Sequence, residues 1–175
     1  KVISRVGSGL SNIDIDAAGD LGISVCYTPY GPTTAVAELV LGAMISLIRM
    51  IPLMDRDMHI KKWNKRIGFQ LEGKTVAIIG YGRIGKKVAE LLSSFNVNIL
   101  VVDPFCKDVI RDYTVLSVEM ALPKADIITI HSSEDKCILG DEEFSIIKSG
   151  AYLLNAARGN LISESSLIKA LDSGK

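Results

Sequence analysis

The segment KTVAIIGYGRIGKKVAELLSSFNVNILVVD, residues 74–103, decides the fold of this chain. It opens on an apolar run, residues 74–79, that is rich in β-branched residues and too short for a helix, which predicts a buried parallel strand. The glycine motif G-x-G-x-x-G follows at residues 80–85, and a helical pattern of apolar residues comes next. A second apolar run, residues 98–102, ends on Asp103. Strand, glycine turn, helix, strand and acidic residue therefore follow one another in the order of a dinucleotide-binding unit.

Each part of this unit has a physical role. Gly80 allows the tight turn after the strand, and Gly82 lets the backbone approach a pyrophosphate because it has no Cβ. Gly85 allows the helix to pack closely on the strand, and the free N–H groups of the helix N-terminus attract phosphate. An ordinary structural turn is the alternative for a glycine motif alone, but the flanking elements favour the dinucleotide site.

The acidic residue predicts which dinucleotide binds. Asp103 lies 18 residues after Gly85, at the tip of the second strand, where its carboxylate can accept both ribose hydroxyls of an adenosine. The 2′-phosphate of NADP would meet a like charge there, and Pro104 offers no compensating cation. We therefore expect NAD as the cofactor.

Composition and charge argue against several other classes of protein. Twenty Lys and Arg residues balance twenty Asp and Glu residues, so there is no net charge or basic block to suggest nucleic acid. The longest apolar run, residues 35–48, is interrupted by Glu38 and is too short to span a bilayer, so we expect no membrane partner. The three cysteines lack metal-ligand spacing, and with no visible signal peptide they indicate no metal site and a reduced, cytoplasmic protein. The chain begins in mid-strand, so we expect further sequence upstream of Lys1.

The remaining pattern alternates short strands with helices, which predicts an α/β fold with a parallel sheet. Further strands are expected at residues 1–6, 22–27, 126–130 and 151–156. Further helices are expected at residues 12–18, 33–51, 52–62, 117–122, 142–148 and 164–171, with an irregular stretch between 104 and 116. Thr33 or Thr34 is expected as the N-cap of the long helix at 33–51, and Asp141 as the N-cap of the helix at 142–148.

The long helix carries an unusually wide apolar face, made of Val36, Leu39, Val40, Ala43, Met44, Leu47 and Ile48. Methionines recur along this helix and the next one, at positions 44, 50, 54 and 58. Such residues are most often core filler, and a subunit interface is the alternative.

Ligands in an open parallel sheet bind outside the carboxyl ends of the strands. Polar residues and glycines lie at these ends, namely Gly80, Asp103, His131, Ser132 and Arg158. The loop Val6-Gly7-Ser8-Gly9 also follows a strand, and its backbone N–H groups could bind a small carboxylate. The residues alone favour a simple turn for that loop.

Several segments together resemble the D-isomer-specific 2-hydroxyacid dehydrogenases, and most of all the D-3-phosphoglycerate dehydrogenase branch. They are RVGSGLSNID at 5–14, AVAEL at 35–39, GKT at 73–75, the glycine motif, VDP at 102–104 and NAARG at 155–159. The resemblance implies a doubly wound parallel sheet, with a C-terminally incomplete Rossmann-type NAD-binding domain at residues 31–175. Residues 1–30 would then be part of a second, flavodoxin-like substrate domain.

The resemblance also implies roles for single residues. Arg158 matches the catalytic arginine, which holds the carboxylate and keto oxygen of the substrate, and the loop of Val6, Gly7 and Ser8 matches the substrate-carboxylate loop. The positions that match cofactor contacts are Ser8, Gly80, Gly82, Arg83, Ile84, Gly85, Asp103, Ser132, Ala156, Ala157 and Arg158.

By the same resemblance, the chain belongs to an NAD-dependent oxidoreductase that transfers a hydride between nicotinamide and a D-2-hydroxy acid, phosphoglycerate-type or related. Its partners would be a small 2-hydroxy or 2-keto acid and a second copy of the chain, through residues 33–63. The family's catalytic Glu and His come after the position of Lys175, so we expect neither in this sequence. His131 is then expected to be a structural hydrogen-bonding residue, and His59 to be solvated.

There are departures from the family pattern, and they keep alternatives open. Ser11 stands where the family often has Asp, and Ser132-Ser133 follow His131 where the family often has Pro. One alternative is an NAD-sensing interaction protein similar to the family's corepressors. The other is a truncated NAD-binding module without catalysis.

Overall fold

The computed structural model describes residues 1–106 and 113–175, and its centre is a five-stranded parallel sheet. The strands lie in the order β5-β4-β3-β6-β7, and every neighbouring pair is parallel. They are β3 (Thr75–Ile79), β4 (Asn98–Val102), β5 (Thr114–Val115), β6 (Ile127–Ile130) and β7 (Tyr152–Asn155). The strands predicted around the glycine motif are therefore confirmed, as is the parallel α/β sheet.

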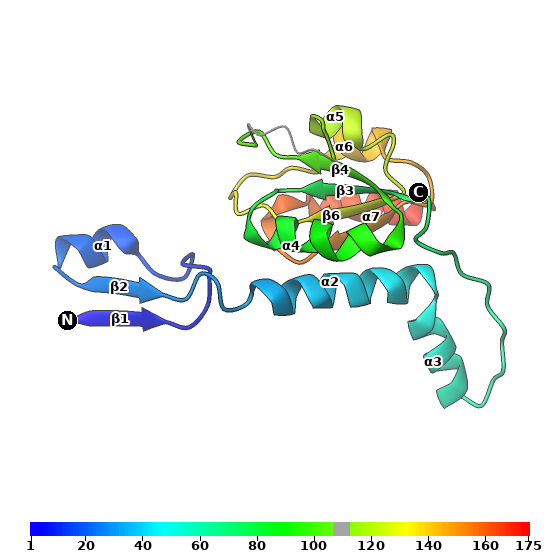
Figure 1. The fold of residues 1–175 in the computed structure, drawn as a ribbon, viewed down its shortest axis with the longest axis horizontal. Coiled ribbons are helices and arrows are strands. Elements are labelled where there is room, and N and C mark those ends of the chain that lie inside the picture. The colour runs from blue at the N-terminus through cyan, green and yellow to red at the C-terminus, as the bar shows by residue number, and fades with distance from the viewer. Residues whose placement is uncertain (107–112) are drawn as a thin grey trace.

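Helices cover both faces of this sheet (Figure 1). One face packs against α2 (Thr33–Ile48) and α4 (Arg83–Leu92), the latter continued by the short 3-10 helix Ser93–Phe95. The other face packs against α5 (Val118–Ala121), α6 (Asp141–Ile146), the 3-10 helix Gly159–Leu161 and α7 (Glu164–Asp172).

The two layers of the core follow from the alternation of side chains along a strand. In β3, Val76 and Ile78 join the cluster beneath α2 and α4, whereas Ala77 and Ile79 join the cluster on the opposite face. Because both faces are covered, all four of these side chains are buried, which explains why the strand appears in the sequence as a continuous apolar run.

A smaller unit lies at the amino end of the chain. Strands β1 (Val2–Arg5) and β2 (Ser24–Tyr27) pair in parallel around α1 (Ile15–Asp20). This unit stands apart from the five-stranded sheet and is joined to it by the start of α2 (Figure 1).

The apolar face of α2 divides into two parts. Ala37, Val40, Met44 and Ile48 are buried against the sheet and α4. In contrast, Leu39 is 67% exposed and Leu47 is 40% exposed. The apolar face predicted from the sequence is thus wider than the part that the sheet and α4 cover, because only about half of a helix surface can face a single neighbouring layer.

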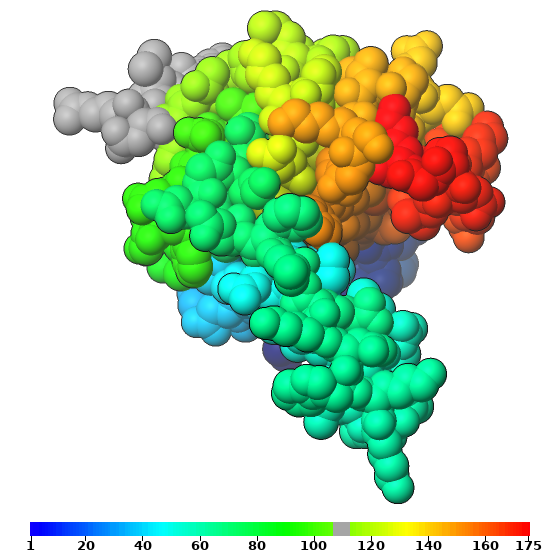
Figure 2. All heavy atoms as spheres, turned by 90° about the vertical axis from the view of Figure 1, so that its right-hand side faces the viewer, coloured from blue at the N-terminus to red at the C-terminus, as the bar shows by residue number. Residues whose placement is uncertain are grey.

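Helix α3 (Ile51–His59) ends three residues earlier than expected and turns sharply from α2. Met50, at the junction, has a left-handed backbone with φ of 56°, and the two helices are bent by 68°. With the segment that follows, α3 forms a projection from the body of the molecule (Figure 2). Among the described residues no single helix is long and apolar enough to cross a membrane; α2 and α3 meet that test of length and composition only as a bent pair.

The projection contains an ion pair between the buried carboxylate of Asp57 and the partly exposed Arg66, which joins its two segments. Asp57 is 5% exposed, and Arg66 donates to its carboxylate from Nη2 at 2.7 Å and from Nε at 3.1 Å. Asn64 donates to the same oxygen at 3.3 Å. Hydrogen bonding from Arg66 lowers the pKa of Asp57 below its ordinary value.

Two of the predicted helix caps are wrong. Helix α2 begins at Thr33 itself, with Pro32 at the N-cap and no side-chain hydrogen bond there. Helix α6 begins at Asp141, with Gly140 at the N-cap, because Glu143 reaches back and accepts from the Gly140 N–H at 2.8 Å. The Asp141 carboxylate instead lies 3.3 Å from Lys169 Nζ, on α7.

The stretch expected to be irregular, residues 104–116, contains the edge strand β5. Its two residues are both exposed, so it lacks the apolar alternation by which strands are recognised in a sequence. Residues 107–112 of that stretch lie outside the described residues.

Candidate functional site

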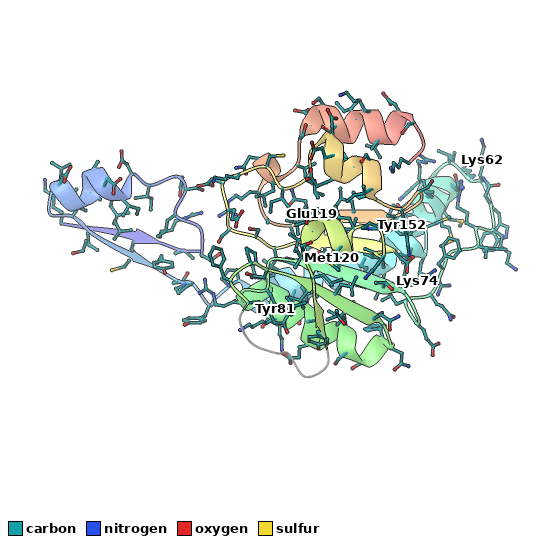
Figure 3. All side chains as sticks on the ribbon, turned by 90° about the horizontal axis from the view of Figure 1, so that it is seen from above. Lys62, Lys74, Tyr81, Glu119, Met120 and Tyr152 are labelled. Carbon is teal, nitrogen blue, oxygen red and sulfur yellow. The ribbon has the colours of Figure 1, made fainter. Side chains whose placement is uncertain are left out.

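The carboxyl ends of the parallel strands all face the N-terminal unit. Tyr81, just after β3, lies at this end of the sheet, whereas Lys74 and Tyr152, at the start of β3 and β7, lie at the other (Figure 3). A cleft of about 290 Å³ opens at the carboxyl end. It is lined by Ser8, Pro29, Pro32, Thr33, Gly82, Arg83, Ile84, His131, Ser132, Ser133, Ala156, Ala157 and Arg158.

A second cleft, of about 250 Å³, adjoins the first and shares Gly82, His131, Ser132 and Ser133 with it. Its remaining lining residues are Ile79, Gly80, Val102, Asp103, Pro104, Phe105, Val118, Glu134 and Ile138. We call these the first and second clefts. Together we call them the channel; the second cleft, which contains Asp103, has a mostly apolar lining, and the first contains Arg83 and Arg158.

The three motif glycines have different surroundings. A Cβ on Gly80 would lie 2.6 Å from the backbone N of Ser132, and its φ of +90° also favours glycine. A Cβ on Gly85 would overlap the carbonyl oxygen of Gly80. A Cβ on Gly82, in contrast, would meet no atom of the described residues within 4 Å, its chain neighbours apart. Gly80 and Gly85 therefore serve close packing, whereas Gly82 leaves space open where the two clefts join.

The N-terminus of α4 borders the open space at Gly82. Gly82 is the N-cap residue, and no side chain caps this helix. The first N–H groups of a helix have no partner within it, and the helix dipole makes this end positive. The junction of the two clefts is thus suited to an anion.

At the far end of the second cleft, Asp103 is held by backbone groups. Its Oδ2 accepts from the Tyr81 N–H at 2.7 Å, and its Oδ1 accepts from the Phe105 N–H at 2.8 Å. The Tyr81 ring packs edge-on against Tyr113, with centroids 6.4 Å apart, and burial raises the pKa of Tyr81 above 10.0. The carboxylate is thereby fixed in orientation while lone pairs remain for a ligand.

Arg158 lines the first cleft and also lies against Gly9 of the N-terminal unit. Its Nη1 donates to the carbonyl of Ala157 at 3.0 Å, and a Cβ on Gly9 would lie 2.6 Å from its Nη2. Arg5 also approaches this loop and donates from Nε to the Gly9 carbonyl at 3.3 Å. No ion pair of the described residues involves Arg158, so the cation next to the glycine loop is not neutralised by a carboxylate.

His131 lies on the floor of both clefts as a neutral imidazole. Burial lowers its pKa from 6.5 to about 4, and its Nε2 lies 2.9 Å from Thr129 Oγ1. This contact confirms the prediction of a structural hydrogen-bonding residue. Its Nδ1 and the Thr33 hydroxyl, in the wall of the first cleft, are buried without a hydrogen-bond partner among the described residues. His59 is exposed on α3, as predicted.

Most of the residues singled out in the sequence meet in this channel. Two do not line it. Val6 is 84% exposed, and the Gly7 N–H donates to Thr28 Oγ1 at 2.8 Å, so Ser8 is the member of that loop that faces the first cleft. Gly85 is buried beneath the channel.

Several lining residues were not expected from the sequence. Pro29, Pro32 and Thr33 border the first cleft, and Phe105, Val118 and Ile138 border the second. None of these side chains belongs to a motif or carries a charge that would have identified it in the sequence.

The fold and the channel define a class of protein. A family model described as the NAD-binding domain of D-isomer-specific 2-hydroxyacid dehydrogenases matches residues 41–175. The chain belongs to this family, and these residues form its NAD-binding domain.

Among the relatives, D-3-phosphoglycerate dehydrogenase from Archaeoglobus fulgidus is 37% identical over all of this chain and 35% of its own length. The human D-3-phosphoglycerate dehydrogenase is 36% identical over all of this chain and 34% of its own. The chain thus spans about a third of the length of these curated relatives.

Solved structures agree with this placement. The structure of D-2-hydroxyisocaproate dehydrogenase has a TM-score of 0.89 at 27% identity and covers 99% of this chain and 55% of its own. The structure of D-lactate dehydrogenase from Escherichia coli has a TM-score of 0.86 at 28% identity, and the match covers 98% of this chain and 58% of its own.

Proposed function

We propose that this chain is the NAD-binding part of an enzyme that transfers a hydride between nicotinamide and C2 of a D-2-hydroxy acid, phosphoglycerate-type or related. The observation that carries the proposal is the unneutralised guanidinium of Arg158 next to Gly9, at the mouth of the first cleft. A small carboxylate could be bound there between two units of the chain. The similarity to D-3-phosphoglycerate dehydrogenases supports the phosphoglycerate class.

The dinucleotide would lie along the two clefts. The ribose of the adenosine would bind Asp103, and the pyrophosphate would lie at the open space beside Gly82 and the N–H groups of Arg83 and Ile84. Gly80 and Gly85 would act by shaping the turn. The nicotinamide end would lie in the first cleft, against Ser8, Ser132, Ala156, Ala157 and Arg158.

The substrate would bind between the loop of Val6, Gly7 and Ser8 and the guanidinium of Arg158. Arg158 would hold the carboxylate and stabilise negative charge on the keto oxygen. Bound NAD would supply the hydride chemistry, and the protein would supply orientation and charge. His131 is unsuited to donating the proton because its imidazole is buried and has a pKa of about 4.

We further propose that residues 1–30 belong to a substrate domain and that the chain acts as a cytoplasmic homodimer. Apolar side chains remain exposed along residues 33–63, with Ile51 at 45%, Met58 at 55% and Trp63 at 84%. With Leu39 and Leu47 of α2 they make up a set of exposed apolar residues, which we call the α2–α3 strip. Exposed thiols at Cys26 and Cys137 agree with a reducing compartment.

The test is to express residues 1–175 and titrate NAD by calorimetry. We expect binding, but little turnover of NADH with a panel of 2-keto acids. A missing proton donor costs about 10²–10⁴ in rate. Absence of NAD binding would refute the proposed site. Turnover near 10 per second, on the order of a typical enzyme, would show that a residue within 1–175 supplies the proton.

A further inference from the structure

Tyr30 and Arg83 form a contact between the segment after β2 and the first residue of α4. The guanidinium carbon of Arg83 lies 5.2 Å from the centroid of the Tyr30 ring, within range of a cation–π interaction. None of the ion pairs among the described residues involves Arg83. The aromatic ring, itself 75% exposed, is thus the partner that the structure gives this cation.

A cation at this position is not held there by its own helix. The N-terminus of α4 is positive, and Lys86 and Lys87 follow in the next turn, so the field of the helix repels the guanidinium. A carboxylate partner would hold Arg83 but would neutralise its charge and repel a phosphate. An aromatic face holds the guanidinium and leaves its charge available.

The contact lies beside the open space at Gly82. Arg83 lines the first cleft together with Gly82 and with Pro29 and Pro32, the residues on either side of the Tyr30–Gly31 pair. Arg83 and the N-terminus of α4 therefore border the same cleft.

Resting on the proposed function, in which the pyrophosphate binds at this helix end, we propose that Tyr30 is a positioning residue for the cofactor. Its ring holds the Arg83 guanidinium at the mouth of the first cleft, where the guanidinium pairs with the phosphates of the dinucleotide. Because Tyr30 lies between the N-terminal unit and α2, the same contact links the phosphates to the connection between the two units.

The experiment compares NAD binding by calorimetry in Tyr30→Ala and Tyr30→Phe. An exposed cation–π contact corresponds to about a two- to fivefold change in an equilibrium constant. We expect Tyr30→Ala to raise Kd for NAD by about that factor, and Tyr30→Phe, which keeps the aromatic face, to bind within error of the unmodified chain. Thermal melting of each variant checks that the fold is intact.

Two further measurements test whether the effect of Tyr30 depends on the phosphates of the cofactor and on the side chain of Arg83. Adenosine, which has no phosphate, should bind equally to the unmodified chain and to Tyr30→Ala. Arg83→Met should weaken NAD binding more than Tyr30→Ala does, and adding Tyr30→Ala to Arg83→Met should cause no additional loss.

The outcomes separate this inference from the proposed function. If the unmodified chain does not bind NAD, the proposed site fails. If it binds NAD and Tyr30→Ala binds equally well, only the positioning role fails. Equal losses in Tyr30→Ala and Tyr30→Phe, or an unchanged effect of Tyr30→Ala in the Arg83→Met background, would also overturn it.

Discussion

The guanidinium of Arg158 lies directly over Gly9, so close that a Cβ at position 9 would come within 2.6 Å of Arg158 Nη2. Gly9 belongs to the N-terminal unit and Arg158 follows β7 of the large sheet. Among the described residues, and apart from its chain neighbours, Gly9→Ala would bring its Cβ against the end of the flexible Arg158 side chain, and the backbone of Gly9 is not in the left-handed region. The contact therefore affects where Arg158 points more than whether the chain folds.

We expect Gly9→Ala to leave the melting temperature unchanged while weakening the binding of a small 2-keto acid. A hydrogen bond to a charged group contributes about 1.5–3 kcal/mol, so the loss should be about tenfold or more. The measurement is a titration of pyruvate in the presence of NADH, followed by nicotinamide fluorescence. Gly19→Ala is the control, because a Cβ there meets nothing within 4 Å.

Gly82→Ala should separate cofactor binding from folding. A Cβ at position 82 meets no protein atom, so the variant should melt like the unmodified chain but bind NAD about tenfold more weakly or worse. Gly85→Ala should instead lower the melting temperature, because its Cβ would overlap the carbonyl oxygen of Gly80. Such overpacking costs about 1–3 kcal/mol of stability. Normal NAD affinity in Gly82→Ala would place the pyrophosphate elsewhere.

Asp103→Asn should reduce the preference for NAD over NADP. The carboxylate repels a 2′-phosphate, so the unmodified chain should bind NAD at least about tenfold more tightly than NADP, and the variant should lose most of that ratio. Competitive titration of both cofactors measures this. The exposed Asp172→Asn serves as the control, and an equal or tighter affinity of the unmodified chain for NADP would contradict the prediction.

Stability should fall as the pH drops from about 6.5 towards 4, because His131 is neutral in the folded protein with a pKa of about 4 and binds a proton near pH 6.5 when unfolded. The unfolded state binds more protons in this window, so acid favours unfolding by at most about 3 kcal/mol. Denaturant unfolding at pH 7.5 and pH 5 checks this. His131→Gln should lose this part of the pH dependence, whereas His59→Gln, at the exposed histidine, should retain it.

Met58→Glu should produce monomers if the α2–α3 strip is a subunit interface. Met58 is 55% exposed on α3, and Met120 is 54% exposed on α5, so Met120→Glu is a control matched in residue type, helix and exposure. A charge buried without a partner at an interface is strongly unfavourable, whereas on an exposed helix it is tolerated. Sedimentation velocity at micromolar concentration measures the oligomeric state of the unmodified chain and of both variants. The prediction fails if the unmodified chain already sediments as a monomer.

Much of the fold follows from local patterns in the sequence. The strand, glycine turn, helix and strand of residues 74–103 are recognisable because each depends on residues near in sequence: β-branched runs, glycines and helical periodicity. The position of Asp103 at a strand end follows from the same pattern. The family resemblance then relates Arg158 and the Ser8 loop to one site, which local patterns alone do not.

The tertiary structure decided the features that depend on partners distant in the sequence. Gly140 rather than Asp141 is the N-cap of α6, with Glu143 accepting from the Gly140 N–H and Asp141 meeting Lys169 on α7, and β5 pairs with the edge of β4. The structure agrees with the separate roles that the sequence assigns to the glycines: Gly80 and Gly85 are packed against backbone, and Gly82 is not. Sequence by itself determined the strands, the helix and the glycine turn of residues 74–103 and the parallel α/β class, but not the edge strand β5. Only the folded chain placed Arg83 on Tyr30 and Arg158 on Gly9, because such contacts depend on how the two units pack and leave no periodic signal along the chain.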